Sequence, residues 1–342
     1  MFRMSQCLSL RAALAAAVVA VCSMSADAAT LLNTYSVITR GSVTLNTSPR
    51  IHGRTLIGGS LTANNSAVFG AQSGTFSLPD DYALVVLGSL SAPGNYVNVD
   101  RGRVRYGGAA GTLHFNMNGA TDPKIALISA ADPFTSAELT QQLADLATLS
   151  ADYAGMSPTA TFQGSFAPNH QVNHFTIEST VGGVAVLNTS STDLFSKNGL
   201  LLSNAASTDA NYLVINVSGS IINQSGAFKF DSDVASSLAA FVQENNTTFA
   251  SKLIWNFHEA TEINLTGNAW LGTILAPNAT LASGTGNIWG GLAVNTITGF
   301  NGEVYGLGDT PNVPPPSTGI PTPSAAAGGL ALLAGAAMKR RR

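Results

Sequence analysis

The sequence has few charged residues and almost no cysteine. Charged side chains make up 10% of the chain, against about a quarter in an average globular protein. The two cysteines, Cys7 and Cys22, both lie within the first 28 residues. The chain beyond residue 28 can therefore form neither a disulfide nor a thiolate metal site. Packing and backbone hydrogen bonds must stabilise it instead.

The charge that is present is mostly negative once the two ends are set aside. The chain has 16 basic and 19 acidic residues, and its ends hold six of the basic ones and one of the acidic ones. The remaining 10 basic and 18 acidic residues give a net charge of −8. Nucleic acid is thus not expected as a partner, because phosphate binding needs a basic surface.

The first 28 residues have the features of a secretory signal peptide. Arg3 and Arg11 precede the apolar run "ALAAAVVAVC", and "ADA" at residues 26–28 supplies small residues for cleavage. We therefore expect secretion through the general secretory pathway.

The other end combines a stiff spacer with a short apolar tail. Residues 310–320 are rich in proline and predict an extended linker. Residues 321–342 continue with about fifteen small or apolar residues and end in four basic ones. A helix of that length rises about 22 Å, short of the roughly 30 Å hydrocarbon core of a bilayer. The tail predicts transient membrane insertion rather than a permanent anchor.

Between these ends, a recurring phrase predicts a β-solenoid. Short apolar runs surround Gly-Ser or Gly-Thr steps; Gly41 and Gly59 are 18 residues apart, and Gly272 and Gly291 are 19 apart. Short strands at such a period, with glycine or asparagine at the corners, are typical of stacked coils. We expect residues 29–309 to form a mainly β, right-handed β-solenoid (β-helix-like) body, with Asn or Thr stacking along its axis. A β-sandwich or jelly roll is the alternative.

Two segments show helical periodicity, and one strand allows a specific prediction. Residues 133–152 and 231–245 each carry an apolar stripe at helical spacing, so two α-helices should pack against the β body.

In "GTILAPNAT", Ile274 is expected to be buried between the coils that carry Gly272 and Gly291. Pro277 should lie at a corner, because proline cannot donate to a β-ladder.

Three phrases, "INVSGS", "KLIWNFHEAT" and "GTILAPNAT", resemble the choice-of-anchor A family of bacterial surface domains, and the resemblance covers most of residues 31–308. It implies a cell-surface domain joined to a sorting device. The tail is similar to a PEP-CTERM sorting signal, with Pro321, Thr322 and Pro323 as the motif and Thr in place of the usual Glu. An exosortase-like processing enzyme is the implied partner. The cell surface or extracellular matrix is the implied location.

Candidate catalytic groups are few. Asp80–Asp81, Asp231/Asp233 and the "HEATE" group (His258, Glu259, Glu262) fit turns, helix caps and a solvated edge better than paired general acids and bases. His170 and His174 have no nearby carboxylate to complete a metal site. We expect no catalytic residue, no metal and no cofactor.

One basic group could bind a ligand. Arg101, Arg103 and Arg105 alternate in "RGRVRY", so on a strand all three would point the same way. Such a row could bind acidic groups of a surface polymer, or it could simply protect an exposed strand edge.

The sequence thus favours a structural or adhesive surface protein without catalytic activity that binds extracellular polysaccharide or another surface polymer. A polysaccharide lyase or hydrolase on a solenoid is the alternative. Ice binding is less favoured, since "SVTLNT" and "NTITG" hint at a threonine face but the coils are irregular.

Overall fold

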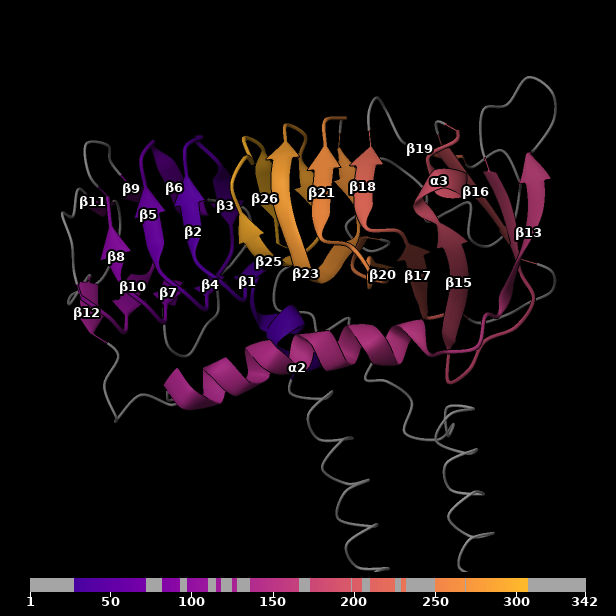
Figure 1. The fold of residues 1–342 in the computed structure, drawn as a ribbon, viewed down its shortest axis with the longest axis horizontal. Coiled ribbons are helices and arrows are strands. Elements are labelled where there is room, and N and C mark those ends of the chain that lie inside the picture. Colours follow the sequence, from indigo (N-terminus) through magenta and orange to yellow (C-terminus); the bar gives the residue numbers. More distant parts are fainter. Residues whose placement is uncertain are drawn as a thin grey trace, which may run out of the picture.

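The computed structural model describes a large β body with one long helix along its side (Figure 1). The described residues are 28–71, 82–92, 97–109, 115–117, 125–127, 136–165, 173–197, 199–204, 210–224, 229–231, 250–267 and 269–306. The second predicted helix (231–245) falls almost wholly outside these ranges. Within them, no helix is both long and apolar enough to cross a membrane.

The strands stack as coils of a solenoid with three sides. The first side, the helix-covered sheet, has a ten-strand path in the order β12(Ile125–Leu127), β10(Arg103–Tyr106), β7(Tyr82–Val86), β4(Thr55–Ile57), β1(Val37–Thr39), β25(Leu292–Ile297), β23(Thr273–Gly284), β20(Leu253–Asn256), β17(Tyr212–Ser218), β15(Val184–Ser190). The second side, the second sheet, has seven strands: β11(Phe115–Met117), β9(Val97–Val99), β6(Ala67–Ala71), β3(Arg50–His52), β26(Glu303–Tyr305), β24(Ile288–Trp289), β22(Trp270–Leu271).

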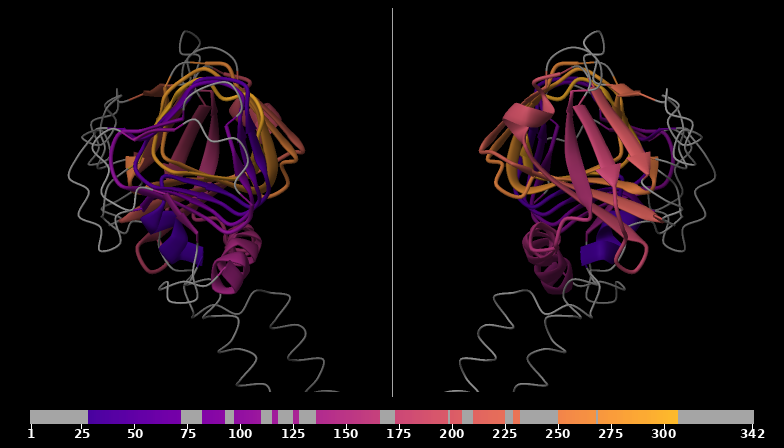
Figure 2. Two further views of the ribbon diagram at one scale, coloured as in Figure 1. Left: turned by 90° about the vertical axis from the view of Figure 1, so that its left-hand side faces the viewer. Right: turned by 90° about the vertical axis from the view of Figure 1, so that its right-hand side faces the viewer.

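The third side is built from two groups of strands. One group is β2(Val43–Leu45), β5(Leu61–Ala63) and β8(Leu90–Ser91); the other is β18(Ile221–Gln224), β21(Glu262–Leu265) and the second halves of β23 and β25. Viewed along the long axis, the coils superpose as a closed tube (Figure 2). A further four-stranded sheet, β13(Ala160–Ser165), β14(Asn173–Ile177), β16(Gly199–Asn204) and β19(Lys229–Asp231), lies at the end of the tube.

The body is mainly β, as predicted, and nearly all of its strand pairs are parallel. Among the named strands described, only β13 and β14 pair antiparallel. A sandwich or jelly roll would be built from antiparallel strands, so that alternative is wrong. Close stacking of glycines explains the Gly-Ser repeat. A Cβ atom on Gly59 would lie 2.4 Å from the backbone nitrogen of Ser42 in the neighbouring coil.

The coils do not stack in chain order. Strand β1 lies between β4 and β25, so the first coil rests on the last one. The Gly41 N–H donates to the Asn295 carbonyl across this junction, at 2.7 Å. From β1 the chain builds coils toward one end of the tube. The later strands of the helix-covered sheet, β15 to β25, begin at the opposite end of the tube and add coils back to β1 in the middle (Figure 1).

Helix α2(Ser136–Ala154) comes between these two halves in the chain and runs along the side of the tube (Figure 1). Its 19 residues span about 28 Å. The four leucines that predicted the helix are all buried against the helix-covered sheet: Leu139, Leu143, Leu146, Leu149. A helical segment at 28–34 lies in the same interface. The short helix α3(Ser191–Leu194) begins after an N-cap, Ser190, whose hydroxyl accepts from the Asp193 N–H.

The interior is apolar, and strand β23 illustrates how it is filled. Ile274 is fully buried in the core of the tube, paired with Trp255 and Leu292, whereas Leu275 points outward and packs under α2. The predicted burial of Ile274 is confirmed. The register of β23 shifts between Ala276 and Thr280, around Pro277, where the strand passes from the helix-covered sheet to the third side. The predicted corner is confirmed too.

Candidate functional site

The three predicted ligand-binding arginines do not form a regular row. Arg101 lies in the bend before β10, and the register of β10 shifts directly after Arg103. The guanidinium of Arg105 stacks over the ring of Tyr82, 4.3 Å from its centroid. Strand β10 pairs with both β7 and β12, so the alternative reading, an exposed strand edge, is wrong. Ligand binding by these arginines stays a prediction.

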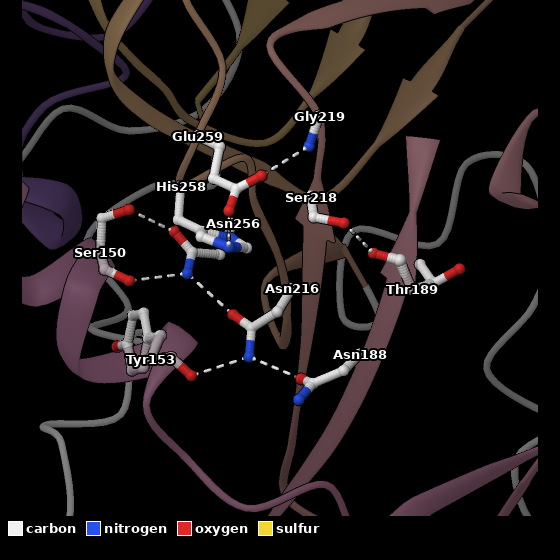
Figure 3. Close-up of polar contacts among 10 residues, drawn as sticks. All are labelled: Ser150, Tyr153, Asn188, Thr189, Asn216, Ser218, Gly219, Asn256, His258 and Glu259. Atoms are coloured by element: carbon white, nitrogen blue, oxygen red, sulfur yellow. Dashed lines mark hydrogen bonds and ion pairs between the residues drawn. The ribbon is translucent and has the colours of Figure 1, made fainter. Parts of the chain in front are cut away.

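The "HEATE" carboxylates bond to the turns around them. The Glu259 carboxylate accepts from the Gly219 N–H at 3.1 Å and lies 3.8 Å from the His258 ring nitrogen (Figure 3). Glu262, on β21, accepts from the amide of Asn264 at 2.7 Å. Only the Glu259–Gly219 bond joins two coils; the other two contacts are local.

The other candidate acids and metal ligands are only partly described. Asp80, Asp81, Asp233 and His170 lie outside the described residues. His174 is on β14, and burial lowers its pKa. In the described part of the chain, no three His, Cys, Asp or Glu side chains gather as a metal site would require.

The second sheet carries a polar and aromatic cluster that no motif in the sequence predicts. Glu303 accepts hydrogen bonds from the Tyr305 hydroxyl and from the His52 ring, the latter at 3.0 Å. Burial acts to raise the pKa of Glu303, but these two bonds, together with the electrostatic attraction of His52 and Arg50, outweigh it and lower the pKa. The rings of Trp289 and Tyr305 stack 4.0 Å apart. The nearby carboxylate of Asp100 pairs with Arg50 at 3.7 Å.

The outward side chains of the third side form a second kind of surface, which we call the polar face. Apart from one exposed apolar residue, Ile221, its residues are short, hydroxyl-bearing or amide-bearing side chains with one carboxylate. They are Ser42, Thr44, Asn46, Ser60, Thr62, Asn64, Ser89, Ser91, Asn223, Glu262, Asn264, Thr280, Ser283, Thr296 and Thr298. Its strands lie side by side along most of the tube (Figure 1).

Serine and asparagine on this face bond mainly to the next coil. The Ser42 hydroxyl accepts from the Ser60 N–H at 2.9 Å. Amide groups pair across coils, Asn64 with Asn46 at 3.0 Å and Asn264 with Asn223 at 2.9 Å. The predicted stacking of asparagine along the axis is confirmed. These side chains hold the coils in register.

The threonines of the face fall into two groups. Thr296 and Thr298 donate to the backbone carbonyls of Ser42 and Leu281 in neighbouring coils, whereas others leave their hydroxyls open. Thr44, Thr62 and Ser91 align in one cross-strand row, and Thr280 aligns with Thr296 on the other half of the face. The hydroxyls of Thr44, Thr62, Ser91 and Thr280 form no hydrogen bond with the described residues. Neighbouring strands lie about 4.8 Å apart. The face thus presents a nearly uncharged, regularly spaced row of donors and acceptors that a ligand can use.

The chain is similar to one known protein family and to solved structures. A family described as "Putative Ice-binding-like adhesive domain" matches residues 28–306. The chain belongs to this family. The match spans the described coils of the tube, so the polar face lies within the matched region.

Two solved structures are similar at low identity. An ice-binding protein from the Antarctic ascomycete Antarctomyces psychrotrophicus is 15% identical over 81% of this chain and 95% of its own, with a TM-score of 0.30. The DUF3494 domain of an ice-binding protein from Shewanella frigidimarina is 11% identical over 80% and 94%, also with a TM-score of 0.30. These scores are too low to carry an argument. No curated protein matches the chain.

Proposed function

We propose that this protein is a non-catalytic adhesive domain of the cell surface or extracellular matrix, which binds a hydroxyl-rich polysaccharide through its polar face. The observation that carries the proposal is the row Thr44–Thr62–Ser91, whose hydroxyls are in register and unengaged by the described residues. Family membership in an adhesive domain supports the same reading.

The chemistry of the row suits sugar hydroxyl groups. Each threonine or serine hydroxyl both donates and accepts, so it can replace the water that hydrates a sugar. A single contact of this kind is weak, but many on one rigid face add up without further loss of chain entropy. An extended polymer should therefore bind better than its monosaccharide.

The test replaces Thr62, in the middle of the row, by tyrosine. Tyrosine is well tolerated on a strand, but its ring would stand above the flat surface and hold a polymer away from it. We expect Thr62→Tyr to weaken binding to neutral polysaccharide films by tenfold or more at an unchanged melting temperature. The matched control is Asn98→Tyr, on the outward side of β9 in the second sheet. Equal binding by Thr62→Tyr and the parent protein would remove the polar face from the proposal.

Ice is a second candidate surface, favoured by the aligned threonines Thr280–Thr296 and Thr44–Thr62. The irregular spacing of the coils in the sequence argued against it, but in space the threonines align because the intervening segments lie off this face. Inhibition of ice recrystallisation by the parent protein, lost in Thr62→Tyr, would favour ice over polysaccharide.

We also propose choice-of-anchor A membership and a tail that is processed by an exosortase-like enzyme after transient membrane insertion. The motif at Pro321, Thr322 and Pro323 and the short apolar run support this proposal. The intact mass of the protein released by its host should correspond to a chain that ends before Ser324. A peptide containing Arg342 in the mature extracellular material would contradict it.

A further inference from the structure

A cleft lies beside the polar face, at the corner where the helix-covered sheet turns into it. The cleft has a volume of about 380 Å³, and Leu143 of α2 forms part of one wall. Arg40 and Gly58, which follow β1 and β4, line it together with Asn278 of β23 and Asn295 of β25. Asn295 directly precedes Thr296, so the cleft adjoins the polar face.

Arg40 brings a fixed positive charge into this cleft. One terminal nitrogen of its guanidinium, Nη1, donates to the Pro277 carbonyl at 3.0 Å and to the Asn278 side-chain oxygen at 2.8 Å. No carboxylate among the described residues pairs with it, and its remaining N–H groups donate to none of them. Arg40 is half-buried. An arginine stays charged at any ordinary pH, so the cleft holds a cation without an anion.

The side-chain amides add neutral donors to this charge. The Asn295 amide makes no hydrogen bond with the described residues, and the Asn278 amide uses only its oxygen, toward Arg40. Both amide nitrogens therefore have N–H groups to offer. Among the described lining residues there is no carboxylate that would repel an anion. The cleft thus combines hydrogen-bond donors with one positive charge, whereas the body as a whole has a negative net charge.

We propose that this cleft binds a carboxylate of an acidic polysaccharide, a uronic acid polymer, whose chain lies across the polar face. The inference rests on the proposed function, which it deepens by naming the class of polymer. The planar guanidinium fork matches a planar carboxylate with two parallel hydrogen bonds. A single cation beside an uncharged face would select polymers with spaced carboxylates over nucleic acid, which needs many basic contacts.

The experiment compares polygalacturonate with its methyl ester, which has the same backbone without the charges. We expect the parent protein to bind polygalacturonate about tenfold more tightly, the gain of a charge-assisted pair. Arg40→Gln should lose this preference and still bind the ester, whereas Thr62→Tyr should lose both polymers. The matched control is Arg50→Gln, on the second sheet, where the guanidinium pairs with the carboxylate of Asp100. It should behave like the parent.

Several outcomes would decide against the cleft. Equal binding of the two polymers by the parent, or a preference retained in Arg40→Gln, would overturn it. Full competition by free galacturonate at the same carboxylate concentration would overturn the polymer as ligand. If Arg40→Gln melts early, Asn295→Leu decides, because it removes one donor and should reduce the preference. If the preference depends on Arg40 but Thr62→Tyr changes nothing, the cleft stands and the polar face of the proposed function fails.

Discussion

Replacing Ile274 by aspartate should prevent the protein from folding. Its side chain is fully buried in the core of the tube, between Trp255 and Leu292 of the adjoining coils. An unpaired charge in such a place costs several kcal/mol, against a total stability of about 5–15 kcal/mol for a typical domain. Because each coil is covered only by its neighbours, a lost coil also exposes the next one. Circular dichroism and the yield of soluble protein provide the measurement.

The matched control is Thr44→Asp, which adds the same charge on an exposed position of β2. It should fold and melt within a few degrees of the parent protein. A cooperative melt of Ile274→Asp near that of Thr44→Asp would mean that residue 274 is not buried, either in the core of the tube or under α2.

Local features of the fold could be predicted because they follow from short-range pattern. Leucines at helical spacing define α2, and Gly41 and Gly59 at an 18-residue spacing mark two stacked corners. The repeat predicts that each coil packs against another coil, but it does not predict which two coils are neighbours. The contact of the first coil with the last joins Gly41 to Asn295, and no pattern in the sequence links two positions so far apart.

The sequence only hinted at the polar face, for a related reason. "SVTLN" and "SLTAN" place Ser, Thr and Asn at the same offsets in two consecutive coils, which is a readable signal for the row at Thr44 and Thr62. The second half of the face, with Thr280 and Thr296, comes from the opposite end of the chain. Only the stacking of β1 on β25 brings the two halves together. The cleft at Arg40 could not be predicted, since its lining comes from five separate segments.

A ladder of three asparagines, two of them buried beneath α2, could likewise not be predicted from the sequence. "VLNTS", "VINVS" and "LIWNF" each place an asparagine after two apolar residues, which reads as a strand end near solvent. In space the three asparagines are register partners; Asn216 and Asn256 are buried beneath α2, whereas Asn188, at the end of the ladder, is exposed (Figure 3). The Asn216 amide donates to the Tyr153 carbonyl of α2 at 2.7 Å and to Asn188 at 2.9 Å. Polar bonds as well as leucines therefore hold the helix in place.

Asn256→Ala should give the largest loss of stability among substitutions of polar residues in this interface. The Asn256 amide is fully buried; it donates to the Ser150 carbonyl and to the Asn216 oxygen, both at 2.8 Å, and accepts from the Ser150 hydroxyl at 2.6 Å. Alanine leaves buried partners without a bond, each at a cost of about 1–3 kcal/mol. We expect a loss of about 2–4 kcal/mol, hence a melting temperature lower by roughly 5–10 °C.

Asn264→Ala is the matched control, because Asn264 also sits in a cross-coil amide ladder, with Asn223, but on the half-exposed polar face. Water can take over its lost hydrogen bonds, so its melting temperature should fall by a few degrees at most. Each asparagine side chain bonds to three groups, so the number of hydrogen bonds lost is the same in both variants. The difference between their melting temperatures therefore reports the effect of burial. Equal shifts in thermal melts of the two proteins would mean that α2 does not shield Asn256 from water in solution, and that its leucines alone hold the helix to the tube.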